Sequence, residues 1–65
     1  MEFKEIVKDI LVTYGYSQQK LANELNVNQT TVSQWLLGHK KPSYDSIEMI
    51  YKKFKITPNE IFGIE

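Results

Sequence analysis

A run of uncharged polar residues between positions 28 and 34 contains the side chains best suited to specific chemistry. Gln29 and Gln34 bear carboxamides, and Thr30 and Ser33 bear hydroxyls, so each of the four both donates and accepts hydrogen bonds. On a helix these residues point outward and form a polar face without charge. Taken alone, the run is typical of a solvated helix face, and only the residues around it favour a binding surface.

Few residues could support catalysis or hold a metal. The chain has no cysteine, no glycine-rich phosphate loop and a single histidine, His39. At 65 residues it also has too little volume for a shielded pocket. We expect no catalytic residue, no metal site, no cofactor and no small-molecule ligand. His39 is expected to be a plain surface residue or a contact to phosphate.

Length and composition restrict the chain to one core. A chain of 65 residues forms a single domain, here residues 1–65. The absence of cysteine fits a reducing compartment, because disulfides cannot support the fold. No stretch approaches the roughly 18 apolar residues of a membrane span, and the N-terminus lacks the pattern of a signal peptide. We therefore expect a cytoplasmic protein with no membrane partner.

The overall charge gives no support to a nucleic-acid partner. Eight lysines and no arginine balance eight acidic residues, so the formal net charge is zero. The distribution is uneven, however. Residues 17–44 contain three lysines and His39 against a single acid, Glu24, which leaves a modest local excess of positive charge.

Helical periodicity and end signals predict three helices in the first two thirds of the chain. The first ends at Gly15. The second, over about 18–25, has Ser17 as its N-cap and Asn26 as its last turn residue, because asparagine tolerates the left-handed conformation. The third, over about 29–37, has Asn28 as its N-cap and ends at Gly38. The apolar stripe of the first helix is Phe3, Ile6, Val7, Ile10, Leu11 and Tyr14.

Two further helices are predicted after Pro42. Ser43 is the N-cap of a helix that ends near Lys55 and has one apolar face. Thr57 and Glu60 form a capping box around Pro58, which predicts a last short turn of helix. The apolar face of the fourth helix is Ile47, Ile50, Tyr51 and Phe54. The sequence thus predicts an all-α, compact bundle of about five short helices.

The second and third helices meet the steric demands of a helix-turn-helix over about residues 17–38. Two short helices joined by about three residues need a close crossing and a turn with an unusual backbone angle. Ala22 is small enough for the crossing, and Asn26 accepts the positive φ. The shared apolar seam is expected to contain Leu21, Leu25, Val27, Val32 and Trp35.

The segment SQQKLANELNVNQTTVSQWLLGHKKPS resembles the helix-turn-helix of the phage Cro and repressor family, the lambda-repressor-like group also called the XRE family. The resemblance extends over nearly the whole chain, because that family has one helix before the motif and about two after it. Eight positions sit at the expected offsets: Gln18, Leu21, Ala22, Asn26, Val27, Val32, Gly38 and Pro42. It implies a transcriptional regulator, most like a Cro-type repressor, that binds a palindromic double-stranded DNA operator as a homodimer.

The resemblance also implies which side chains contact bases. Gln29 matches a glutamine that makes a bidentate contact to adenine, the pairing expected when an amide meets N6 and N7 in the major groove. Thr30 and Gln34 match further base-contacting positions, and Ser33 lies one turn along from Gln29. These four residues would set specificity.

A second group would contact the DNA backbone. Gln18 matches a residue that contacts a phosphate while bracing the glutamine equivalent to Gln29. Asn28, His39, Lys40 and Lys41 flank the recognition helix and are expected to contact phosphates in a salt-sensitive way. Leu37 departs from the family, many of whose members have a polar residue there; it is expected in the core, on a dimer partner or over a sugar.

Three apolar residues near the C-terminus leave two interpretations open. Ile61, Phe62 and Ile64 either close the core or form a dimer interface, and the little chain left to cover them favours the interface.

Trp35 is expected in the core, where its N–H needs an acceptor or must reach the surface. The chain is either complete or an excised N-terminal domain. Two rival functions remain: an antitoxin or regulatory subunit whose main partner is a protein, and an interaction module that lost DNA binding.

Overall fold

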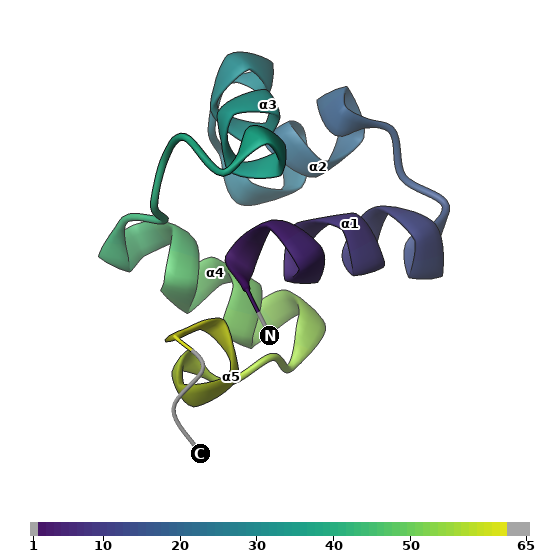
Figure 1. The fold of residues 1–65 in the computed structure, drawn as a ribbon. Helices are drawn as coiled ribbons and strands as arrows, with labels where there is room; N and C mark the ends of the chain where they lie inside the picture. Colours follow the sequence, from purple (N-terminus) through teal and green to yellow (C-terminus); the bar gives the residue numbers. More distant parts are fainter. Residues whose placement is uncertain (1, 63–65) are drawn as a thin grey trace.

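The computed structural model describes residues 2–62, except for the side chain of Phe62. Across these residues the chain forms five α-helices joined by short turns, and no strand (Figure 1). The predicted all-α architecture is confirmed. No helix in this range is both long and apolar enough to cross a membrane. In chain order the helices are α1 (Phe3–Tyr14), α2 (Gln18–Leu25), α3 (Gln29–Leu37), α4 (Tyr44–Phe54) and α5 (Pro58–Phe62).

The first three helices end where the sequence predicts, each at a residue with positive φ. Gly15, Asn26 and Gly38 have φ values of 66°, 59° and 76°. α4 also ends in this conformation, at Lys55, whose φ is 61°. A lysine gives no sequence signal for a left-handed residue, so only the position of this end was predictable.

Three of the predicted N-caps are confirmed. The hydroxyl of Ser17 accepts from the backbone N–H of Lys20 at 3.0 Å, and that of Ser43 accepts from Ser46 N–H at 3.2 Å. Thr57 forms the expected reciprocal box, in which its N–H donates to Glu60 Oε2 at 2.9 Å and Glu60 N–H donates to its Oγ1 at 3.3 Å.

The expected side-chain cap at Asn28 is wrong. Asn28 is the N-cap of α3 by its extended backbone, with φ −78° and ψ 151°, but its side chain makes no capping hydrogen bond. Its carbonyl accepts from the N–H of Thr31 at 3.0 Å, as an N-cap carbonyl does. Because Asn28 is exposed, water can form hydrogen bonds with its carboxamide and with the first N–H groups of the helix.

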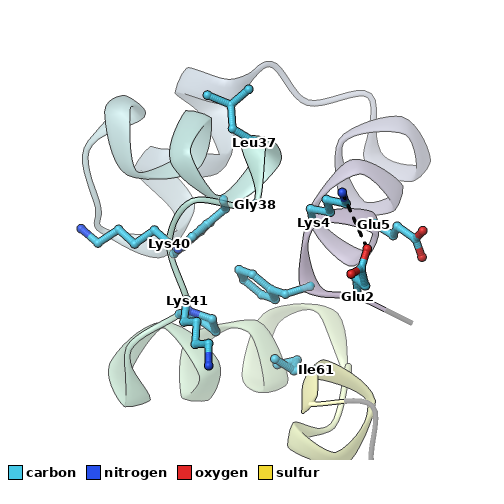
Figure 2. A pocket seen from close by; sticks show the side chains of 11 residues that line it. Glu2, Lys4, Glu5, Leu37, Gly38, Lys40, Lys41 and Ile61 are labelled. Atoms are coloured by element: carbon cyan, nitrogen blue, oxygen red, sulfur yellow. Dashed lines mark ion pairs between the residues drawn. The ribbon is translucent and has the colours of Figure 1, made fainter.

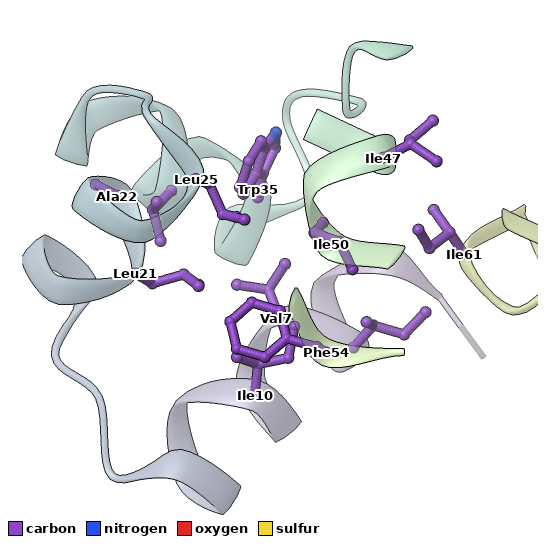
Figure 3. Packing of buried hydrophobic residues seen from close by; sticks show 12 residues of the cluster. Val7, Ile10, Leu21, Ala22, Leu25, Trp35, Ile47, Ile50, Phe54 and Ile61 are labelled. Atoms are coloured by element: carbon purple, nitrogen blue, oxygen red, sulfur yellow. The ribbon is translucent and has the colours of Figure 1, made fainter. Parts of the chain in front are cut away.

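One apolar core lies between the helices and receives side chains from all five (Figure 3). Trp35 of α3 is only 1% exposed, and the ring of Phe3 from α1 meets it edge-on at 5.2 Å. Contrary to expectation, the buried Nε1 of Trp35 neither reaches the surface nor has a hydrogen-bond partner among residues 2–62. The buried apolar residues are Ile6, Val7, Ile10, Leu21, Ala22, Leu25, Val32, Trp35, Ile47, Ile50, Phe54 and Ile61.

Two tyrosines predicted on apolar faces lie at the margin of the core. Tyr14 and Tyr51 are each 49% exposed. Tyr14 still packs on Phe54, with ring centroids 4.9 Å apart, and so joins the end of α1 to the end of α4. A tyrosine can occupy such a margin because its ring packs while its hydroxyl stays in water.

Candidate nucleic-acid interface

The crossing of α2 and α3 forms the frame of the candidate site. α2 and α3 pack against each other (Figure 1), and Ala22 on α2 is fully buried. After α2, Asn26 reverses the chain, and the N–H of Val27 donates back to the carbonyl oxygen of Ala22 at 2.9 Å. Val32 and Trp35 of α3 are buried on the inner side, so the polar residues of this helix are turned away from the core.

All four predicted base-contacting residues lie on α3. Gln29 and Thr30 in its first turn are exposed, whereas Ser33 and Gln34 in the next turn are half-buried. α3 contains no charged residue, so its outer surface consists of amide and hydroxyl groups. Such a surface can form directional hydrogen bonds with a partner without a charged side chain of its own.

A hydrogen bond between α2 and α3 gives Gln18 a different partner from the one that the resemblance implies. Gln18, at the start of α2, was expected to brace Gln29. Instead the hydroxyl of Ser33 donates to Gln18 Oε1 at 2.7 Å. Ser33 lies one turn further along α3 than Gln29, and the crossing brings that turn to the start of α2. This pair could not be predicted from the sequence, because nothing local links two polar residues 15 positions apart.

Four of the five predicted phosphate-contacting residues flank α3, and the fifth, Gln18, opens α2. Asn28 precedes the helix, and His39, Lys40 and Lys41 follow it; all four are exposed. Neither Lys40 nor Lys41 forms an ion pair with another described residue. Figure 2 shows both lysines on the loop after α3. This loop and the start of α1 lie on opposite sides of a groove.

Leu37 lies beside these lysines at the end of α3 and is 61% exposed. Of the three locations considered for it, the core is therefore excluded. A leucine exposed to this degree at the edge of a polar helix can still contact a partner through its methyl groups.

The third lysine of residues 17–44 is already paired. Lys20 lies 3.1 Å from Glu24 on α2, and Lys53 of α4 approaches the same carboxylate to 3.3 Å. The hydrogen bonds and positive charges of these two lysines hold the pKa of Glu24 below its ordinary value of 4.5. The positive excess predicted for residues 17–44 is consequently carried by Lys40 and Lys41 and not by Lys20.

The predicted dimer residues fall into two groups. Ile61 is only 3% exposed and belongs to the core, so it is not an exposed contact for a second subunit in this fold. Helix α5 is short and amphipathic, and its packing on α1 and α4 turns Ile61 inward. Ile64 and the side chain of Phe62 lie outside the described residues. Over residues 2–62, no group of three histidines or acids is arranged to hold a metal ion.

Two short helices crossing at a buried alanine, with a left-handed turn between them and a polar outer helix, define a helix-turn-helix protein. A helix-turn-helix family model matches residues 7–61, and the chain belongs to that family. It is also 32% identical over all 65 residues to the HTH-type transcriptional activator BcrR of Enterococcus faecalis. The chain spans 32% of the length of that relative. No solved structure matches significantly.

Proposed function

We propose that this protein is a transcriptional regulator that binds double-stranded DNA in a sequence-specific way, with α3 in the major groove. The observation that carries this proposal is the uncharged, outward-facing amide and hydroxyl surface of α3, followed by two lysines that form no ion pair within the described part of the chain. An α-helix fits the major groove, and amides match the donor and acceptor pattern of base edges there. Membership of the helix-turn-helix family and the likeness to a named transcriptional activator support it.

In this proposal Gln29 makes the principal base contact. Its carboxamide is exposed in the first turn of α3, the part of a recognition helix that enters the groove, and can bond N6 and N7 of an adenine. Thr30 offers a methyl group to thymine, and Gln34 offers a second amide. Asn28, His39, Lys40 and Lys41 bond phosphates on either side and fix the position of the helix.

We further propose that two copies bind a palindromic operator, with recognition helices about one helical turn of DNA apart. With Ile61 in the core, the interface of such a dimer has to be formed by other residues. Repression by occlusion of a promoter stays a prediction. The relative is named as an activator, and the same helix pair can support either effect at an operator.

The test begins with selection of bound sites from random duplex DNA, followed by Gln29→Ala. Loss of a bidentate contact should weaken binding to the selected site by about 1 to 3 kcal/mol and relax preference at one base pair. Lys40→Ala is the matched control: it should weaken all sequences alike and lower the salt dependence by about one unit. Unchanged discrimination by Gln29→Ala would refute the role of Gln29, and failure to shift any DNA at low salt would refute the proposed function.

A further inference from the structure

Ser33 differs from its neighbours on α3 because its hydroxyl proton is already engaged. The hydroxyl donates to Gln18 Oε1 at 2.7 Å, a short bond between two half-buried side chains on different helices. A serine hydroxyl has only one proton, so Ser33 retains only acceptor capacity toward any partner. Gln29, Thr30 and Gln34 form no side-chain hydrogen bond within the described part of the chain.

The same bond determines which end of the Gln18 carboxamide is available. Because Oε1 accepts from Ser33, the two N–H donors on Nε2 are left for another partner, and the described residues provide none. Phosphate oxygens are acceptors only. A carboxamide whose oxygen is engaged and whose nitrogen is free is therefore complementary to a phosphate, whereas one rotated by half a turn would present an oxygen and repel it.

We propose that Ser33 is a positioning residue for DNA binding: it orients Gln18 so that Nε2 donates to a backbone phosphate, and it does not itself recognise a base. The inference rests on the proposed function and reassigns one of the four residues that the sequence placed at the bases. Base recognition by α3 then falls to Gln29, Thr30 and Gln34.

The test is a double-mutant cycle on the affinity for DNA. Ser33→Ala should weaken binding about three- to tenfold, the usual effect of one neutral hydrogen bond, and should do so equally across a panel of operator variants. Gln18→Ala should give a similar loss, and adding Ser33→Ala to it should cause little further change, because both substitutions remove the same contact. The salt dependence should stay as in the wild type, since a neutral amide releases no counterion of its own.

Two controls separate positioning from a structural effect. Ser33→Thr retains a hydroxyl at this position and should restore most of the affinity. Thr13→Ala removes an exposed hydroxyl from α1, outside the motif and 20 positions before Ser33, and should leave affinity unchanged. Thermal unfolding of each variant verifies that it is folded at the assay temperature.

The outcomes that overturn the inference are distinct from those that overturn the function. Two results would show that Ser33 contacts DNA independently of Gln18, without affecting the proposed function. One is a changed preference at a single base pair in Ser33→Ala. The other is a double variant in which the two losses of affinity multiply. If no variant and no wild-type protein binds DNA, both proposals fall. The NMR signals of the Gln18 side-chain amide in the free protein should shift in Ser33→Ala and not in Thr13→Ala; an unchanged signal would show that the bond is absent.

Discussion

The two helices of the motif are held in place by different means. α2 begins at a side-chain cap, Ser17, and its single acid, Glu24, is bonded to lysines on its own helix and on α4. α3 begins at Asn28 without a side-chain cap and carries no charge. Its position depends on the packing of its inner side chains and on one hydrogen bond, from Ser33 to Gln18.

The difference shows how a small domain separates support from recognition. In α2 the polar groups are largely used within the protein, through a cap, an ion pair to a neighbouring helix and a bond from Gln19 to Asn23 at 3.0 Å. In α3 the outer polar groups, apart from Ser33, are left for solvent or a partner. Uncommitted amides can be desolvated against base edges without first breaking an internal bond.

The largest effect should come from breaking the crossing that both helices share. Ala22→Leu adds volume at a fully buried contact and should lower the free energy of unfolding by about 1 to 3 kcal/mol through overpacking. Denaturant unfolding measures the change. Asn23→Leu, one position along on the exposed side of α2, should change stability by less than about 0.5 kcal/mol. Equal effects of the two substitutions would show that the crossing is not tightly packed.

A smaller effect should distinguish the starts of α2 and α3. Ser17→Ala removes a real cap and should lower the free energy of unfolding by about 1 kcal/mol. Asn28→Ala removes a side chain with no capping bond and should lower it by less than about 0.5 kcal/mol, while still weakening DNA binding if Asn28 contacts a phosphate. The two are compared by urea titration. A cost at Asn28 as large as that at Ser17 would contradict the difference between the helices.

The smallest effect concerns the charges that join α2 to α4. The pKa of Glu24 is lowered in the folded protein by its hydrogen bonds to Lys20 and Lys53 and by their charges, so its contribution to stability is present above pH 4.5. That contribution is lost as the pH falls through the folded pKa, because protonation removes both ion pairs. Glu24→Gln should therefore be less stable than the wild type at neutral pH, and the gap should close in acid. A gap independent of pH would show that the lysines do not stabilise this carboxylate.

Local signals in the sequence were enough for the helices and for the polar face. The spacing of apolar residues, the glycines at 15 and 38 and the asparagine at 26 act within a few residues, so they placed the helix ends before any packing was known. Capping at Ser17, Ser43 and Thr57 was predictable for the same reason. The lack of charge between positions 29 and 37 is a property of the sequence itself.

The tertiary structure alone decided how the polar groups are shared. Whether Gln18 meets Gln29 or Ser33 depends on the angle at which α2 and α3 cross and on two side-chain rotamers, neither of which any local pattern encodes. The pairing of Glu24 with Lys53, 29 positions away, and the burial of Ile61 depend in the same way on where α4 and α5 pack. The periodicity of the sequence determines which side of a helix is apolar. Only the packing of the helices determines which polar side chains come within hydrogen-bond distance of each other.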